Sequence, residues 1–211
     1  MHEVKTWFTD QRIQRTLAAL EKNGFQTFFV PTKDKVLDKV LSLIPSNANV
    51  GIGGSVTIRE INLIDALTAR GNTVFEHWLQ PEENVTIIMR KQLTSDVFVA
   101  SSNAVTEDGK LINIDKAGNR VASMIFGPKR VLLVIGINKI VKDLDEGIRR
   151  LRNVAAPMNA KRRGDKTPCA ITGMCTDCET PDRVCRIITI IEKIPSRTDM
   201  TVILVGEELG F

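Results

Sequence analysis

Apolar residues recur at two different spacings along the chain, which predicts that helices and strands alternate. Ile13, Leu17 and Leu20 stand at helical spacing within 6–22. Comparable apolar stripes predict further helices over 36–44 and 58–67, and a charged helix is expected over 143–153. Short apolar runs between glycine, proline and polar residues predict strands over 25–30, 49–52, 73–77, 96–100, 111–114, 131–137, 186–192 and 201–206. Residues 82–93 suit a helix or an extended segment.

Strands that alternate with helices predict an α/β fold. Such an order needs crossover connections, which favour a mostly parallel sheet with helices on both faces. Asp108 and Gly109 stand between two apolar runs and predict a hairpin, so we expect a mixed sheet. No repeat or linker divides the 211 residues, and we expect a single domain over 1–211. A cysteine-rich loop is expected at about 160–186, and a loop that long is usually functional.

Composition and charge exclude several classes of protein. A hydrophobic content of 43% with 26% charged residues supports a full core and excludes disorder, collagen-like sequence and coiled coil. The net charge of +4 is dispersed and aromatic residues make up 5%, so we expect no nucleic-acid binding. No apolar run approaches the roughly 18–20 residues of a membrane span, and no secretory signal is evident. The sequence therefore predicts a cytoplasmic protein without membrane contact.

A glycine-rich turn at 51–57 is the first candidate for ligand binding. Its sequence, Gly-Ile-Gly-Gly-Ser-Val-Thr, stands between a predicted strand and a predicted helix. Glycines allow close backbone approach, and a helix N-terminus attracts phosphate or carboxylate. The segment is neither a Walker A motif nor a complete Gly-x-Gly-x-x-Gly. The alternative is an ordinary turn in which Thr57 and Glu60 form a capping box. The candidate ligand-binding residues are Gly53, Gly54, Ser55 and Thr57.

Small polar and acidic residues at 101–109 follow a predicted strand, where ligands collect in open α/β sheets. Glu107 is the candidate catalytic residue, as a nucleophile or general base. The alternative is a solvated turn to which Asp108 and Gly109 contribute only backbone geometry. Further candidates for ligand binding fall in this segment or at turns beside apolar runs: Asn103, Asp108, Asn119, Arg120, Asn138 and Lys139.

All four cysteines lie within one short segment, at Cys169, Cys175, Cys178 and Cys185. Four clustered thiolates favour a metal site that holds Zn(II) or an iron–sulfur cluster. The spacing matches neither a zinc ribbon nor a ferredoxin, so the metal stays open. Thiol–disulfide chemistry and free structural thiols are the two alternatives. With only two histidines, a Ser-His-Asp or Cys-His triad has little support.

Several of these segments resemble the LUD domain, which is named for lactate utilization. They occur in order over nearly the whole chain, at 51–60, 102–109, 119–128, 134–141 and 202–211. The resemblance implies a fold like that of ribose-phosphate isomerase, glucosamine-phosphate isomerase and the CoA transferases. In that group a glycine turn binds phosphate or a CoA-linked group, which matches Gly53, Gly54 and Ser55. Its CoA transferases use a glutamate before a small turn. Glu107 has a comparable setting, although Thr-Glu-Asp-Gly is not their motif.

The resemblance also implies a function. Relatives act beside iron–sulfur oxidoreductase subunits in oxidising L-lactate to pyruvate, so such subunits are the expected partners. We expect a LUD-family protein that binds a small anionic organic acid or phosphorylated ligand and supports lactate utilization. One alternative is a stand-alone isomerase or acyl/CoA transferase that uses Glu107. Another is a non-catalytic regulatory or assembly subunit. The fold group is compatible with a homo-oligomer.

Overall fold

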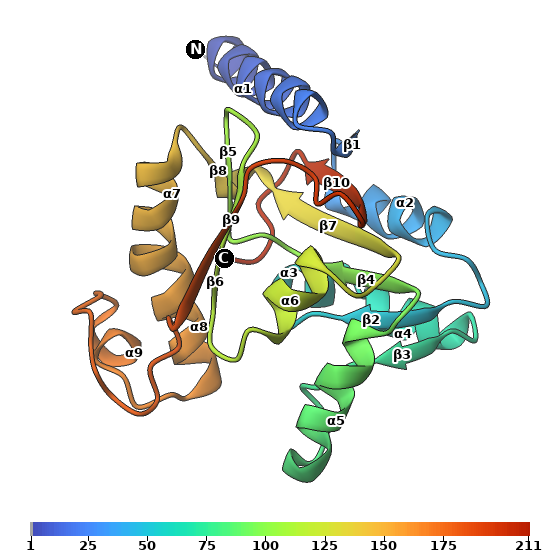
Figure 1. Cartoon of the computed structure of the whole chain (residues 1–211). Helices are drawn as coiled ribbons and strands as arrows, with labels where there is room; N and C mark the ends of the chain where they lie inside the picture. The colour runs from blue at the N-terminus through green and yellow to red at the C-terminus, as the bar shows by residue number, and fades with distance from the viewer. Residues whose placement is uncertain (1) are drawn as a thin grey trace.

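The computed structural model describes residues 2–211, which form two sheets that share a hydrophobic core (Figure 1). All strand pairs of the larger sheet are parallel. Each strand is reached through a crossover, as the alternation of strands and helices predicts. In spatial order its six strands are β1 (Gln26–Val30), β10 (Asp199–Val205), β7 (Arg130–Gly136), β4 (Val97–Ala100), β2 (Asn49–Ile52) and β3 (Thr73–Phe75).

The predicted hairpin belongs to a second sheet and not to the main one. Residues 101–103 lead the chain away from the end of β4, and the strand that follows pairs with β6 and β8. The antiparallel pairs expected of a mixed sheet all lie in this smaller sheet. Its four strands, in spatial order, are β8 (Ile140–Val141), β5 (Ala104–Thr106), β6 (Leu111–Asp115) and β9 (Ile187–Ile191).

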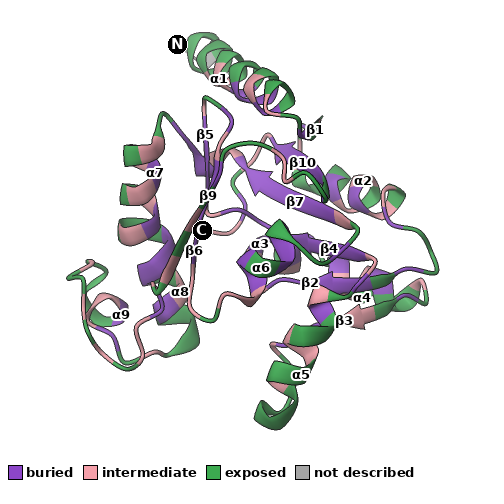
Figure 2. Ribbon diagram, viewed as in Figure 1, coloured by how far each residue is buried: buried purple, intermediate pink, exposed green. Residues whose placement is uncertain are grey.

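Both faces of the main sheet are buried, because other elements cover each of them (Figure 2). Successive side chains of its central strands point to opposite faces. Val99 and Val134 pack with helices on one face. Phe98 and Leu133 pack on the other face, against α1, α6 and the second sheet. The helices on the first face are α2 (Val36–Ser42), α3 (Val56–Glu60) and α4 (Leu63–Ala69), and those on the second face are α1 (His2–Lys22) and α6 (Asn119–Ile125).

Several helices differ from the expected pattern. The stripe over 58–67 forms two helices, because Asn62 adopts the left-handed conformation with φ 53° and interrupts it. Residues 82–93, which suited either structure, form helix α5 (Glu82–Leu93). Helix α6 was not predicted from periodicity. The chain also forms two short 3-10 turns, η1 (Lys33–Lys35) and η2 (Ile137–Lys139).

The helix expected over 143–153 extends further and shortens the expected loop. It runs through α7 (Leu144–Arg150), a π-helical turn η3 (Leu151–Ala155) and α8 (Ala156–Arg163). Pro157 lacks an N–H group, and the wider π turn ends two residues before it. A further helix, α9 (Pro168–Thr172), occupies part of the segment expected to be a loop. Across the described residues, no helix combines the length and apolarity needed to cross a membrane.

Candidate functional site

A cavity of about 880 Å³ opens where the main sheet meets the second sheet. The turns that follow β2, β4 and β7 form its inner wall, through residues such as Thr57, Ser101 and Lys139. The end of β6, helix α8, residues 77–80, the first part of the helix over 82–93 and the start of α6 line other parts of it. Carboxyl ends of parallel strands meet at one edge of a sheet, and open α/β sheets bind ligands there. This cavity is therefore the candidate functional site.

Most of the predicted ligand-binding residues line this cavity. Tertiary structure brings together turns that lie far apart in the sequence, as the strand order requires. The predicted residues in the lining are Gly54, Ser55, Thr57, Asn103, Asn119, Arg120 and Lys139. The structure does not bring Gly53, Asn138, Glu107 or Asp108 into the lining.

Lys139 contributes a buried ammonium group to the cavity. Its residue is 2% exposed, and Nζ donates to Thr57 Oγ1 at 2.8 Å and to Ser101 Oγ at 3.0 Å. Both acceptors are hydroxyl groups and neither is a carboxylate. Burial, and then the positive charges of Arg150 and Arg120, lowers the pKa of Lys139 to about 7. The group therefore changes its charge near neutral pH.

Residues 209–211 close over Lys139 and are held by Asn138. The Asn138 amide donates to the Gly210 carbonyl at 3.0 Å and accepts from the Leu209 N–H at 3.2 Å. Gly210 has φ +55°, and a Cβ there would lie 2.5 Å from Thr57 Oγ1. A larger residue would therefore displace the cover. Asn138 supports the site from outside the lining, whereas the sequence predicted that it contacts the ligand.

Arg120 joins the two sheets beneath the cavity. Its guanidinium donates to the Ser101 carbonyl at 2.9 Å and the Ile114 carbonyl at 2.8 Å, and also to the side chains of Asn103 and Asn113. It is 8% exposed, and its Nε lies 3.6 Å from the Asp115 carboxylate, so these contacts fix a paired charge at the cavity wall. Gly53 makes room for this arrangement, because a Cβ there would lie 3.2 Å from Arg120 Cγ.

Helix α3 follows the glycine turn, and its N-terminal cap is not the pair of Thr57 and Glu60. Ser55 is the N-cap residue and its Oγ accepts from the Ile58 N–H at 3.4 Å. The alternative of a capping box between Thr57 and Glu60 is therefore wrong. Thr57 instead bonds to Lys139 and donates to the Leu209 carbonyl at 3.3 Å, while Glu60 accepts from the Gly210 N–H at 2.7 Å. Both side chains serve tertiary contacts.

Glu107 and Asp108 lie at the hairpin beside α1, outside the cavity lining. Arg12 and Arg15 of α1 donate to the Glu107 carboxylate at 2.8 and 3.0 Å. Partial burial opposes ionisation of Glu107, but hydrogen bonds from Arg15 and Arg12 outweigh it and lower its pKa. Asp108 forms an ion pair with Lys110 at 2.8 Å. In this arrangement both carboxylates hold the hairpin and do not face the candidate site.

Trp78 and the arginines around it were missed by sequence reasoning. The Cζ atoms of Arg59 and Arg162 lie 4.3 and 3.8 Å from the centre of the Trp78 ring. Gly54 allows the indole to approach, since a Cβ there would lie 2.6 Å from Trp78 Nε1. Arg59 is also bonded to Glu76, which accepts from the Trp78 N–H at 2.7 Å. The only available signal was a tryptophan directly after a predicted strand.

His77 also lines the cavity and was not among the predicted site residues. It is buried, and its Nδ1 lies 3.0 Å from Gln92 Nε2. Burial lowers the pKa of His77, so the ring is neutral at physiological pH. The same Gln92 nitrogen donates to the carbonyls of Ile52 at 2.8 Å and Phe75 at 3.0 Å, which fixes the amide beside the ring. His77 therefore adds a polar but uncharged group to the lining.

The four cysteines are free thiols of intermediate exposure. Cys169 and Cys185 pack against a small apolar cluster that includes Val184. Burial raises the pKa of Cys185. Between residues 2 and 211, no three His, Cys, Asp or Glu side chains are arranged to hold a metal ion. As placed here, the thiols do not fit a Zn(II) or iron–sulfur centre, and the metal site stays a prediction.

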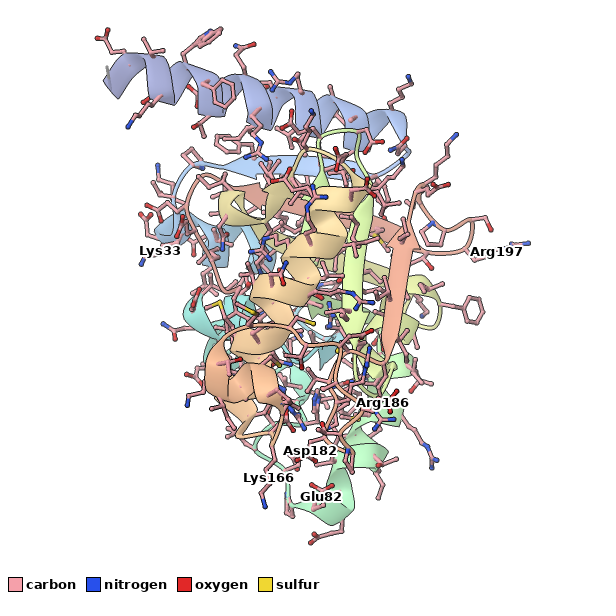
Figure 3. The ribbon with its side chains drawn as sticks, turned by 90° about the vertical axis from the view of Figure 1, so that its left-hand side faces the viewer. Lys33, Glu82, Lys166, Asp182, Arg186 and Arg197 are labelled. Atoms are coloured by element: carbon pink, nitrogen blue, oxygen red, sulfur yellow. The ribbon has the colours of Figure 1, made fainter. Side chains whose placement is uncertain are left out.

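The cysteine segment nonetheless borders the cavity, through Val184. Asp182 is fixed there, because its carboxylate accepts from the Lys166 N–H at 3.0 Å. Figure 3 shows Lys166 and Asp182 at the same end of the molecule as Glu82, the first residue of α5. Glu82 lines the cavity as well. The cysteine segment and the start of α5 therefore lie at one end of the molecule, and each contributes a residue to the cavity lining.

The fold and the cavity place the chain among α/β proteins that form their functional site at the carboxyl ends of parallel strands. The sequence model of the LUD domain matches residues 13–205, so the chain belongs to the LUD domain family. The family name relates the chain to lactate utilization in general terms. A search of curated proteins found no match.

Among solved structures, the chain resembles the crystal structure of a DUF162 family protein from Deinococcus radiodurans at 1.70 Å resolution. The TM-score is 0.59 at 12% sequence identity, over 94% of this chain and 98% of the other. At this identity the likeness shows the fold alone. It confirms the α/β fold that the sequence predicted.

Proposed function

We propose that the cavity binds a small anionic organic acid or phosphorylated ligand and that this binding supports lactate utilization. The observation that carries the proposal is the buried ammonium of Lys139, which faces the cavity with two hydroxyl partners. Burying a charge without an opposite charge is unfavourable. An anion in the cavity would offset that cost; Arg120 also lies at the wall, where it is paired with Asp115 at 3.6 Å.

The groups around the Lys139 ammonium, here called the inner site, suit a carboxylate or phosphate. An ammonium group has three N–H donors, and the Thr57 and Ser101 hydroxyls accept from two of them. The third donor is available to a ligand oxygen. A bound anion favours the charged form of Lys139 and raises its pKa above the value of about 7 in the free protein. Binding above pH 7 therefore takes up a proton, and affinity falls as pH rises.

Titration calorimetry at pH 6.5 with inorganic phosphate, L-lactate, pyruvate and glycerol 3-phosphate tests the proposal. Lys139→Met should weaken binding of the best of these probes at least tenfold. Lys129→Met is the matched control, because Lys129 is 86% exposed in its side chain and does not line the cavity. Equal affinity in the wild type and Lys139→Met would refute the proposal, as would unchanged affinity at pH 8.5.

The alternative of an isomerase or acyl/CoA transferase depends on Glu107. The contacts of Glu107 with Arg12 and Arg15 do not favour it, because they direct the carboxylate to α1. The binding proposal does not require Glu107. A regulatory or assembly subunit would use the same cavity for binding alone.

A further inference from the structure

The cavity is larger than a small anion bound at the inner site would require. Its volume of about 880 Å³ is in the range of pockets that hold ligands of drug size. Lactate and inorganic phosphate have only a few non-hydrogen atoms and would fill a small part of it. The lining beyond Lys139 therefore indicates what else a natural ligand carries.

A second positive cluster lies in the same lining, around Trp78. Arg59, Arg162 and Arg163 all line the cavity, and the first two contact the indole ring. Both guanidinium groups lie within cation–π distance of the same indole ring. The cluster therefore places positive charge on this side of the cavity.

The positive charge of this cluster is only partly compensated. Arg59 is paired with Glu76, and Arg163 with Asp165 at 2.9 Å. Arg162 contacts the Asn159 amide oxygen and the Trp78 ring, neither of which is an anion. Burial and the nearby charges of Arg163 and Arg59 lower the pKa of Arg162. Like charges brought together in this way favour a bound anion.

The glycine turn connects the two positive regions. Gly54 abuts Trp78, and Thr57 accepts the hydrogen bond from Lys139. Three residues along one chain span at most roughly 10 Å. A single small molecule can therefore reach from the Lys139 ammonium to the arginines at Trp78.

We propose that the ligand is an organic acid with two separated anionic groups. One group is bound by Lys139 at the inner end and the other by Arg162 and Arg59 at the outer end. This inference rests on the proposed function, because it assumes that the inner end binds an anion. It adds that the ligand is extended and carries a second carboxylate or phosphate.

Matched probes separate the second charge from ligand size. Gluconate 6-phosphate and sorbitol 6-phosphate have the same length, but only the former has a carboxylate in addition to its phosphate. Glucarate and gluconate form the corresponding pair for a second carboxylate. By calorimetry, the doubly charged member of at least one pair should bind at least tenfold more tightly to the wild type. The pair with the larger gain identifies whether the ligand is a phosphorylated acid or a dicarboxylic acid.

Arg162→Gln should reduce that gain to less than twofold, while Arg197→Gln should retain it. Arg197 is exposed and lies outside the cavity lining (Figure 3). The protein has two tryptophans, so in a Trp7→Phe background the emission reports on Trp78 alone. The doubly charged probe should change this emission more than its singly charged partner.

The outcomes distinguish this inference from the proposed function. If the members of each pair bind equally and binding depends on Lys139, the inference is overturned and the proposed function stands. If Arg162→Gln leaves the gain intact, the outer end does not bind the second group and the inference is likewise overturned. If no probe binds in a manner that depends on Lys139, the proposed function itself fails.

Discussion

Replacing Lys139 by methionine should stabilise the unliganded protein, by an amount that decreases as pH rises. In the folded protein burial lowers the pKa of Lys139 from 10.5 to about 7. The unfolded chain therefore binds this proton more tightly, and stability rises with pH between the two values. Methionine fills a similar volume and has no charge to bury. The hydroxyls of Thr57 and Ser101 lose a donor but keep their own bonds to the Leu209 and Ser102 carbonyls.

The magnitude follows from the difference between the two pKa values. One pKa unit corresponds to about 1.4 kcal/mol. The unfavourable contribution of Lys139 is then about 5 kcal/mol at pH 6 and about 2 kcal/mol at pH 9. The two hydrogen bonds of the ammonium group are already part of the folded state in which this pKa applies. The pH-dependent part, about 3 kcal/mol between pH 6 and pH 9, is the quantity to measure.

Urea unfolding of both proteins at several pH values from 6 to 9, with thiols kept reduced, gives this quantity. The free energy of unfolding of Lys139→Met minus that of the wild type should decrease by about 3 kcal/mol over the range. Taking the difference cancels the other titrating groups. Lys129→Met, at an exposed position, should show a difference that does not change with pH. Parallel curves for Lys139→Met and the wild type would refute the argument that burial perturbs this ammonium.

Three further predictions concern the surroundings of the cavity. Glu107→Gln should cost about 1 kcal/mol of stability near neutral pH, because the ion pair with Arg12 is lost. The cost should vanish as acid protonates Glu107. A large loss of probe affinity in this variant would contradict the placement of Glu107 outside the cavity. Gly54→Ala should cost about 1–3 kcal/mol and shift the emission of Trp78, because the new methyl group meets the indole nitrogen; an unchanged spectrum would refute the close contact. Mass-spectrometric labelling with iodoacetamide should modify Cys185 most slowly, because burial raises its pKa. The same labelling tests the predicted metal site, since Zn(II) or an iron–sulfur cluster would protect all four thiols together until a chelator releases them.

The predicted site residues and the lining of the candidate cavity overlap in part. The turns that follow β2 and β7 bring Thr57 and Lys139 to the lining. The reason is geometric, because parallel strands bring such turns to one edge of the sheet. Glu107 was chosen for its chemistry and its place after a strand. Its strand belongs to the second sheet, which directs it to the arginines of α1.

Local sequence determined the alternation of strands and helices, the glycine turn and the buried strands, because each depends on the spacing of apolar residues or on a few adjacent residues. Residue similarity also identified the family. Only the tertiary structure decided that the hairpin leaves the main sheet. It also decided that Arg59 and Arg162 both contact Trp78, and that Lys139 is buried beside hydroxyl groups. These properties depend on contacts between segments distant in the sequence, and no local pattern records which charge will be desolvated or paired.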